Sequence, residues 1–210
     1  MRRSPPPRKL NILTVGVLAL QGDVREHLAA FARCGVASHP VRLPDELSKI
    51  DALALPGGES TTVSRLLRVF DLEEPLRQRI DAGMPCFATC AGLIMLSKTI
   101  VDGRDDQLTL GAFDIAVRRN AYGRQVDSFE GDLEVSGVSG PPFRAVFIRA
   151  PQIESWADDV EVLASYDNKP VAIRQGRHLG LAFHPEMTGD WRIHQLFLEG
   201  LAEEPVKSAA

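Results

Sequence analysis

The fold is decided by the stretch PCFATCAGLIML, residues 85–96. A short apolar segment runs into Cys90, and small residues then lead directly into an apolar helical run. This is the layout of a nucleophile elbow, a tight strand-to-helix turn that holds the reactive atom at its tip. A thiol at a helix N-terminus is favoured in its anionic form by backbone N–H groups and by the helix dipole. The alternative is that Cys90 is a small core residue, as most free cysteines are.

The segments before and after the elbow turn alternate between strand and helix patterns. Apolar runs predict strands at residues 14–20, 41–43, 52–55 and 85–89. Helical spacing of apolar residues predicts helices after Asp23, after Gly58, before Gly83 and over residues 93–100. This alternation is typical of a parallel sheet with helices on both faces, in which ligands bind at the carboxyl ends of the strands. Gln21, Gly57-Gly58 and Cys90 all follow predicted strands, so we expect them to meet in one site.

The second half of the chain has a different pattern. Short strands joined by polar turns are predicted at residues 113–117, 133–135, 145–148, 160–163, 171–173 and 179–183. A final helix is predicted after Thr188. We therefore expect an α/β protein with a mixed sheet and a mostly antiparallel section in its second half. Residues 10–203 form one predicted domain, between a disordered extension at 1–9 and a flexible tail at 204–210.

Composition and charge exclude several classes of protein. The 210 residues are 44% hydrophobic and 25% charged, as in an ordinary globular domain. A net charge of −4, with no basic run, argues against a nucleic-acid partner. Cys34, Cys86 and Cys90 are too few for a disulfide scaffold and lack metal-ligand spacing, so we expect no metal and a reducing, cytoplasmic location.

The N-terminal residues resemble a secretion signal only superficially. Arg2, Arg3, Arg8 and Lys9 precede an apolar stretch, but polar and glycine residues interrupt that stretch. The apolar stretch is better interpreted as the first strand. No segment approaches the length needed to cross a membrane, so no membrane partner is expected.

A cysteine nucleophile needs a base, and His184 is the strongest candidate among the five histidines. It ends an apolar strand, and Glu186 follows two residues later, so both side chains project from one face of an extended chain. Glu186 would then fix the imidazole tautomer while the other ring nitrogen faces Cys90. The alternative is an exposed pair at a strand end. His27 and His194 lie on predicted helices beside charged residues, and we assign them no role.

An acyl-transfer site also needs N–H donors for the oxyanion. The backbone N–H of Ala91 follows the nucleophile, and Gly58 lies in a turn at a neighbouring strand end. The alternative for Gly57-Gly58 is an ordinary turn, and for Ser60 and Thr61 an ordinary helix cap.

Six blocks of sequence carry a resemblance to a known family. They are residues 20–27 (LQGDVREH), 55–62 (LPGGESTT), 89–92 (TCAG), 119–130 (RNAYGRQVDSFE), 147–151 (FIRAP) and 183–186 (FHPE). The cysteine and the His-Pro-Glu pair are typical of triad glutamine amidotransferases in general. The blocks at 55–62 and 119–130 are more specific, and through them the chain resembles the glutaminase subunit of pyridoxal 5′-phosphate synthase.

This resemblance implies a class I glutamine amidotransferase-like, flavodoxin-like, three-layer αβα fold. It implies hydrolysis of L-glutamine to glutamate and ammonia by Cys90, His184 and Glu186, through a thioester. Substrate contacts are implied for Gly57, Gly58, Glu59, Ser60, Arg119, Ile148 and Arg149. A guanidinium at Arg119 or Arg149 suits the α-carboxylate of the substrate, and Glu59 suits its ammonium. The alternative for either arginine is a surface ion pair.

The resemblance also implies a partner. Ammonia would pass to a (β/α)₈-barrel synthase subunit, in a hetero-oligomer that makes pyridoxal 5′-phosphate from ribose 5-phosphate and glyceraldehyde 3-phosphate. This chain would need no cofactor, because pyridoxal 5′-phosphate is the product of the complex. We expect weak activity until the partner docks and completes the oxyanion hole, with Gln21 coupling docking to catalysis.

One departure from the family pattern bears on the turn. Ala88 stands where the family usually has glycine, and an alanine there would be strained if its φ were positive. Cys86 is interpreted as a core residue. Two rival functions stay open: a γ-glutamyl hydrolase of the same architecture, and a catalytically silent subunit retained for assembly.

Overall fold

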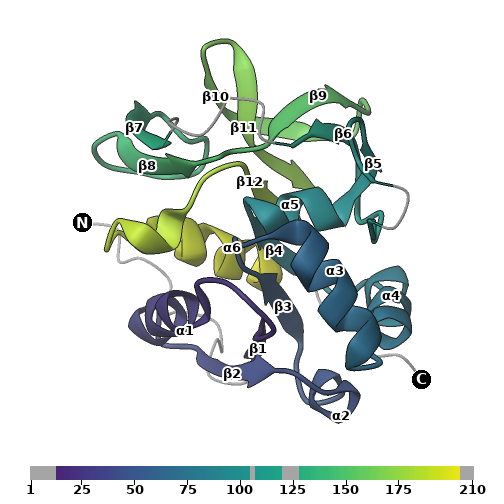
Figure 1. Cartoon of the computed structure of the whole chain (residues 1–210). Helices are drawn as coiled ribbons and strands as arrows, with labels where there is room; N and C mark the ends of the chain where they lie inside the picture. Colours follow the sequence, from purple (N-terminus) through teal and green to yellow (C-terminus); the bar gives the residue numbers. More distant parts are fainter. Residues whose placement is uncertain (1–12, 105–106, 120–127, 204–210) are drawn as a thin grey trace.

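A seven-stranded mixed sheet forms the centre of the computed structural model, which describes residues 13–104, 107–119 and 128–203 (Figure 1). The strand order is β10-β11-β12-β4-β3-β1-β2. Five neighbouring strands are parallel: β2 (Ala37–Val41), β1 (Thr14–Leu18), β3 (Ala52–Leu55), β4 (Cys86–Thr89) and β12 (His178–Leu181). The antiparallel strands β11 (Lys169–Gln175) and β10 (Glu161–Tyr166) extend one edge. The predicted mixed α/β sheet is thus confirmed.

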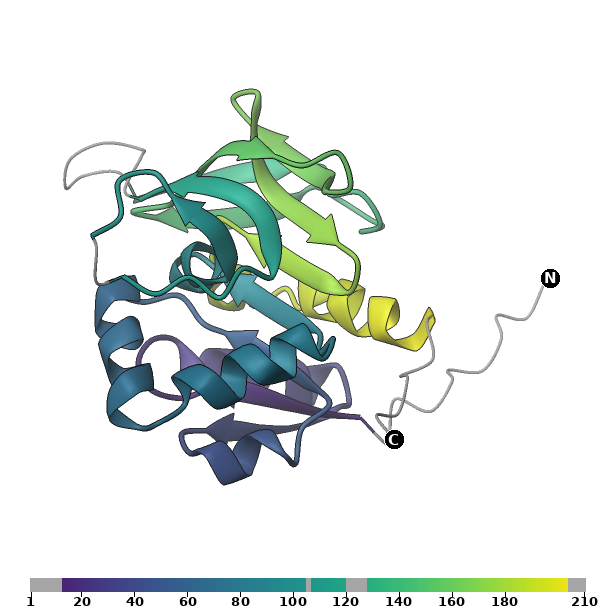
Figure 2. The same cartoon turned by 90° about the vertical axis from the view of Figure 1, so that its right-hand side faces the viewer.

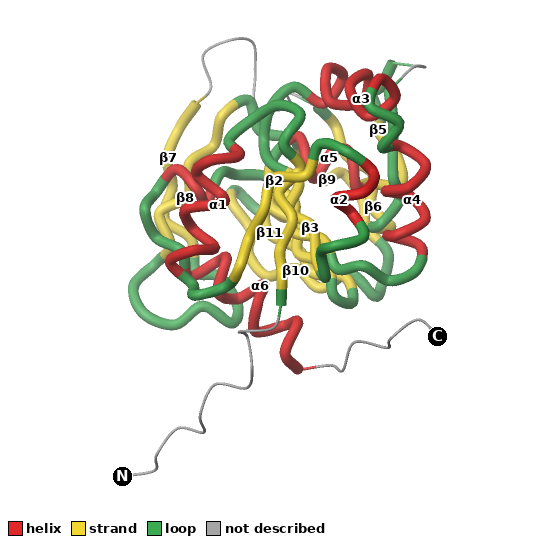
Figure 3. Tube along the Cα trace, turned by 90° about the horizontal axis from the view of Figure 1, so that it is seen from below, coloured by secondary structure: helices red, strands yellow, loops and turns green. Residues whose placement is uncertain are grey.

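Helices cover both faces of this sheet, which gives the predicted three layers. In Figure 3, α1 (Val24–Arg33) and α6 (Arg192–Glu203) lie on one side of the strands, while α3 (Ser60–Val69) and α4 (Glu73–Asp81) lie on the other. The short helix α5 (Ala91–Leu96) packs against α3 and against β3, β4 and β12. A further short helix, α2 (Pro44–Leu47), follows β2 and contacts α4.

Two smaller sheets lie near β10 and β11, at the antiparallel end of the main sheet (Figures 1 and 2). One contains β5 (Ser97–Ile100), β6 (Phe113–Arg118) and β9 (Gln152–Trp156), with β6 and β9 antiparallel. The other is the antiparallel pair β7 (Ser128–Leu133) and β8 (Phe143–Ile148). The backbone N–H of His184 donates to the carbonyl of Val146 in β8 at 2.8 Å, which ties the smaller sheet to the chain that follows β12.

The predicted element boundaries were wrong in several places. The helix after the elbow turn ends at Leu96 rather than continuing to Ile100, because the chain becomes extended at Ser97 and forms β5, where Thr99 and Ile100 are β-branched. Residues 133–135 are not a strand: β7 ends at Leu133. Leu43 lies outside β2 and is the N-cap residue before α2. Strand β9 was not predicted, and the first residues of β7 were also missed.

The turn after β4 depends on close packing beside the parallel strands. A Cβ on Gly92 would lie 2.1 Å from the carbonyl oxygen of Leu55, so only glycine lets α5 approach β3 this closely. Ala88 lies within β4 and has no positive φ, so the alanine that departs from the family pattern is tolerated without strain. Cys86 is fully buried in the same strand, as predicted for a core residue.

The predicted extension 1–9 and tail 204–210 lie outside the described residues, as does the greater part of the 119–130 block. Among the described residues, no helix has the length and apolar character needed to span a bilayer.

Candidate active site

Cys90 lies at the tip of a strained turn between β4 and α5. Its φ and ψ are 47° and −102°, a conformation that costs a non-glycine residue about 1–3 kcal/mol. Its N–H donates to the carbonyl of Leu181 in β12 at 2.8 Å, and its carbonyl accepts from the N–H of Ile94. This is the strand–turn–helix geometry of a nucleophile elbow, with the sulfur held at the carboxyl ends of the parallel strands.

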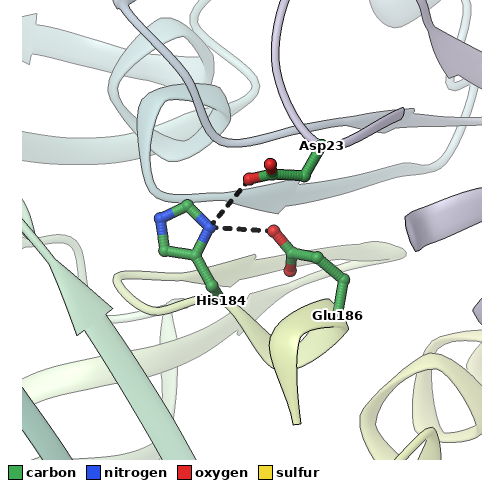
Figure 4. A group of neighbouring side chains, drawn as sticks. All are labelled: Asp23, His184 and Glu186. Carbon is green, nitrogen blue, oxygen red and sulfur yellow. Dashed lines mark hydrogen bonds and ion pairs between the residues drawn. The ribbon is translucent and has the colours of Figure 1, made fainter. Parts of the chain in front are cut away.

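His184 lies between Cys90 and two carboxylates. Its Nδ1 is 2.8 Å from Oε1 of Glu186 and 3.4 Å from Oδ2 of Asp23 (Figure 4). Cys90 and His184 line the same cavity, and Cys90 is close enough to the ring to be among the groups that raise the pKa of His184, while its thiol donates to the carbonyl of Ile148 at 3.7 Å. A sulfur, an imidazole and a carboxylate from distant parts of the sequence are thus gathered at one place, as a Cys-His-Glu triad requires.

The electrostatic surroundings favour a charged imidazole and a charged carboxylate. Burial alone would lower the pKa of His184, but hydrogen bonds with Asp23, Cys90 and Glu186 raise it well above its usual range. Burial would raise the pKa of Glu186, yet His27 and His184 hold it well below its usual range. The side chain of Glu186 is completely buried, whereas that of Asp23 is 37% exposed. Glu186 is therefore the protected partner of the imidazole.

The geometric reason predicted for the His184–Glu186 pair was wrong, although the pair forms. The two residues do not share one face of an extended chain, because Pro185–Met187 form a 3₁₀ turn after β12 has ended at Leu181. Pro185 occupies the first position of that turn, where its missing N–H costs nothing. The turn folds Glu186 back under the imidazole.

A cavity of about 280 Å³ opens beside Cys90 and His184. It is lined by all but one of the predicted substrate residues and by Gln21: Gln21, Gly58, Glu59, Ser60, Arg119, Ile148 and Arg149. Ile94, Gly22 and Asp23 complete the wall and were not predicted. Arg149 has a φ of 45°, so the backbone is strained at a second point on this wall.

Gly57 does not line the cavity but lies against the imidazole of His184. A Cβ at this position would be 2.2 Å from Cε1 of His184. The Gly57 N–H donates to Oγ1 of Thr89 at 2.9 Å, which fixes the turn beneath the ring. Gly57 thus seats the base rather than contacting a ligand in the cavity.

Glu59 has a structural role that the sequence did not predict. Its carboxylate accepts hydrogen bonds from the N–H and hydroxyl groups of Thr61 and Thr62, so it is the N-cap of α3. Burial works against its ionisation, but these donors outweigh it and lower the pKa of Glu59 to about 2. Ser60, predicted as a possible cap, is the first helical residue instead.

Gln107 joins two predicted substrate residues and was missed by the sequence analysis. Its Oε1 accepts from Nη1 of Arg119 at 2.5 Å, and its Nε2 donates to Oγ of Ser60 at 2.8 Å. Arg119 is therefore aimed at the cavity through a side-chain amide rather than through a surface ion pair. No motif marks Gln107 in the sequence.

Gln21 connects the loop after β1 with the turn after β3. Its Oε1 accepts from the N–H of Glu59 at 2.7 Å. The same side chain lies over Gly58, where a Cβ would be 2.4 Å from that oxygen. Gln21 is thus in contact with the turn that was predicted to supply an oxyanion donor.

His27 and His194 lie on helices, as predicted, and the sequence assigned them no role. Both are completely buried, and the ring atoms Nδ1 of His27 and Nε2 of His194 are 3.0 Å apart. A signal was available, because His27 lies on the same helical stripe as Val24, Leu28 and Phe31. Charged neighbours on the outer face of α1 obscured it.

Asp23, His184 and Glu186 place three ligand atoms within 4.8 Å of one another. Carboxylate oxygens and a ring nitrogen are the donors that a zinc ion takes. The 2.8 Å hydrogen bond between Nδ1 of His184 and Glu186 already accounts for this arrangement, so we assign no metal to it.

Residues 17–203 match the SNO glutamine amidotransferase family. The chain belongs to that family. Relatives named pyridoxal 5′-phosphate synthase subunit PdxT are similar to this chain over most of its length. The protein of that name from Mycobacteroides abscessus is 60% identical over 88% of this chain and 95% of its own length. The one from Frankia casuarinae is 58% identical over 89% of this chain and 94% of its own length.

Solved structures support the same fold. A crystal structure described as a glutamine amidotransferase superposes with a TM-score of 0.83 and 48% identity, over 90% of this chain and 98% of that one. The structure of PurLQS from Thermotoga maritima, at 18% identity, has a TM-score of 0.63 over 90% of this chain and 98% of that one. This distant likeness bears on the fold alone, and together the two confirm the class I glutamine amidotransferase-like architecture.

Proposed function

We propose that this chain is the glutaminase subunit of a pyridoxal 5′-phosphate synthase. The observation that carries the proposal is that Cys90 and His184 line one cavity, with the Glu186 carboxylate 2.8 Å from Nδ1 of His184. Family membership and the PdxT relatives support glutamine as the substrate and vitamin B6 synthesis as the pathway served.

Hydrolysis begins when the sulfur of Cys90 attacks the side-chain amide carbon of L-glutamine. His184 takes the thiol proton, and its raised pKa favours this transfer. The tetrahedral intermediate collapses as His184 protonates the departing nitrogen, which leaves as ammonia and produces a thioester on Cys90. His184 then takes a proton from water as the water oxygen attacks the thioester carbon; the C–S bond breaks, glutamate is released, and His184 returns the proton to the sulfur of Cys90. Glu186 holds the imidazole in the tautomer that both steps need.

The cavity wall supplies recognition of the amino-acid end of glutamine. Arg119 and Arg149 are the guanidinium groups that line the cavity, and one of them binds the α-carboxylate. Glu59 faces the ammonium, since its lowered pKa keeps it ionised. Ser60 and Ile148 complete the contacts. Gly57 contributes by seating His184 rather than by touching substrate.

The oxyanion is stabilised by the N–H groups of Ala91 and Gly58. Each such donor is worth roughly 3 kcal/mol in the transition state. The side chain of Gln21 lies over Gly58, so a partner that docks at the loop after β1 can change the Gly58 turn. On this basis we expect the isolated chain to be weakly active and the complex to be fully active.

The partner is a (β/α)₈-barrel synthase subunit that receives the ammonia in a hetero-oligomer. This chain carries no cofactor of its own in the proposal, because pyridoxal 5′-phosphate forms on the partner. The complex is proposed to work in the cytoplasm, without a nucleic-acid or membrane partner.

The decisive experiment compares the parent chain and Cys90→Ala in the reconstituted complex. We expect Cys90→Ala to abolish glutamine-dependent synthesis of pyridoxal 5′-phosphate, and ammonium chloride to restore synthesis in full. If Cys90→Ala supports synthesis from glutamine as the parent does, the chain is a silent assembly subunit. If the parent cleaves γ-glutamyl peptides in preference to glutamine, the chain is a γ-glutamyl hydrolase.

A further inference from the structure

A chain of buried polar contacts continues behind the triad, on the side of Glu186 away from His184. Glu186 uses Oε1 for His184, while its Oε2 is 3.5 Å from Nε2 of His27. Nε2 of His27 is also 3.3 Å from Oγ1 of Thr89, and Nδ1 of His27 is 3.0 Å from Nε2 of His194. We call His27 and His194 the buried histidine pair.

Both members of the pair are buried from solvent. His27 and His194 are each 0% exposed and pack against the rings of Phe31 and Phe87. Burial of an imidazole is costly unless its polar atoms have partners. The pair lies on α1 and α6, the two helices on one face of the sheet, and meets the end of β4 at Thr89.

The hydrogen positions of the pair follow from its neighbours. If His27 carried its proton on Nδ1, its Nε2 lone pair would face the Glu186 carboxylate, and His194 would have to keep a proton on Nδ1. Nδ1 of His194 has no hydrogen-bond partner, so that proton would be buried without an acceptor. With protons on Nε2 of both rings, His194 donates to His27, and His27 donates toward Glu186 and Thr89. Only this arrangement gives every ring proton an acceptor.

We propose that the buried histidine pair positions the catalytic triad by holding the second oxygen of Glu186, with donors that point from His194 through His27 to the carboxylate. The inference rests on the proposed glutaminase function for its kinetic test. Oε2 of Glu186 is completely buried and makes no hydrogen bond of ordinary geometry, and Nε2 of His27 lies 3.5 Å from it, within range of an electrostatic contact. In this proposal the Nε2–H dipole of His27 attracts Oε2, which disfavours rotation of the carboxylate and keeps Oε1 on Nδ1 of His184.

The groups that face this carboxylate come from three elements. His27 approaches from α1, Thr89 from β4, and His184 from the chain after β12, with Asp23 also touching His184. The pKa of His194 is lowered to about 3 by burial and by the neighbouring His27, so that ring stays neutral and acts through its Nε2–H donor. The pair therefore supplies dipoles aimed at Glu186.

Substitution of His27 tests the proposal. His27→Leu removes the donor, whereas His27→Gln carries an N–H₂ group near the position of Nε2. We expect the kcat of glutamine hydrolysis in the complex to fall about tenfold in His27→Leu, as for loss of a hydrogen bond to a charged group, and to recover largely in His27→Gln. The acidic limb of the pH profile should move to higher pH in His27→Leu, because Glu186 loses a group that keeps it ionised.

His178 provides a matched control. It is a partly buried histidine at the start of β12, and its Nδ1 accepts the N–H of Cys86 at the opposite ends of the strands. His178→Leu should lower the melting temperature and leave both kcat and the pH profile unchanged. The proposal is overturned if His27→Leu matches the parent or His178→Leu in these two readouts, or if His27→Gln does no better than His27→Leu.

A measurement on the unaltered chain keeps the proposal testable if His27→Leu fails to fold. Nitrogen-15 spectra of labelled histidine report which ring nitrogen carries the proton. We expect the Nε2–H tautomer for both His27 and His194, and a proton on Nδ1 of His27 would overturn the proposal. The spectra need no substrate, so this result stands or falls separately from glutaminase activity.

Discussion

The imidazole of His184 lies directly against the α-carbon of Gly57, where a Cβ would come within 2.2 Å of Cε1. The His184 ring is therefore held by the Glu186 carboxylate on one side and by the backbone of Gly57 on another. The turn after β3 fixes the position of a side chain that arises more than a hundred residues later, because both lie at the carboxyl ends of parallel strands.

Gly57→Ala should displace the imidazole while leaving the fold intact. We expect the kcat for glutamine to fall about a hundredfold, since misplacement of a catalytic group by 1 Å costs about that much. Steady-state glutaminase kinetics with the synthase partner, together with a thermal melt, measure the two effects. Gly200→Ala in α6 is the control, because nothing lies within 4 Å of its added methyl and activity should not change. A Gly57→Ala variant with parental kcat would contradict the seating role of this glycine.

Alkylation should discriminate among the three cysteines. Burial raises the pKa of Cys34 to about 11, with a contribution from Glu199, and burial also raises the pKa of Cys86 far above its usual range. Neither forms much thiolate at pH 7, so iodoacetamide should label Cys90 alone. Peptide mass spectrometry after brief labelling checks this, and Cys90→Ala should remain unlabelled. Labelling of Cys34 at pH 7 at the same rate as Cys90 would contradict the prediction.

Glu59 should make folding stability depend on pH. Its pKa in the folded chain is about 2, below the roughly 4.3 of an unfolded glutamate. The contribution of ionised Glu59 to the free energy of unfolding is therefore fully present above about pH 5 and is lost as the pH falls toward 2. The melting temperature of Glu59→Gln should lie below that of the parent at pH 7, and the gap should close near pH 2. A gap that is independent of pH would show that the charge of Glu59 has no part in capping α3. Glu130→Gln, at an exposed ion pair with Arg144, should show a much smaller gap at pH 7.

Gln107→Ala should weaken substrate binding more than chemistry. Arg119 would lose the amide that orients it, so we expect KM for glutamine to rise about fivefold to tenfold with little change in kcat. Michaelis–Menten curves for the complex make the comparison. Gln195→Ala, where the amide pairs with Glu199 on an exposed face of α6, should leave KM unaltered. A lowered kcat at constant KM would assign Gln107 to the chemical step instead.

Gln21→Ala should uncouple the partner from the active site. The N–H of Glu59 would lose the side-chain oxygen that accepts its hydrogen bond, and the turn at Gly58 would lose the side chain that lies over it. The ratio of glutaminase activity with and without the synthase partner should therefore fall well below the ratio for the parent. An unchanged ratio, with unchanged affinity for the partner, would remove Gln21 from the coupling.

Much of the fold could be predicted from the sequence, because buried parallel strands and amphipathic helices leave strong periodic patterns. The short strands could not be predicted in this way. Exposed acidic residues occur within β7 (Glu130 and Asp132) and β9 (Glu154), and β5 follows a helix without a break. Cys90, His184 and Glu186 could be selected because nucleophile, base and orienting acid follow from the chemistry.

Other parts of the site arise only in three dimensions. The 3₁₀ turn at Pro185 replaces the extended geometry that seemed sufficient to pair His184 with Glu186. Gln107 acts through one side-chain amide in a loop, with no pattern around it. His27 on α1 and His194 on α6 are in contact only in the folded chain, so the sequence of neither helix predicts the pair.

Glu59 has two roles at the start of α3: it lines the cavity, and its carboxylate caps the N-terminus of the helix. Any change of specificity made at Glu59 would therefore carry a penalty in folding. Redesign for other amides would meet a related limit at Ile94, whose apolar side chain borders the cavity and also packs in the hydrophobic core.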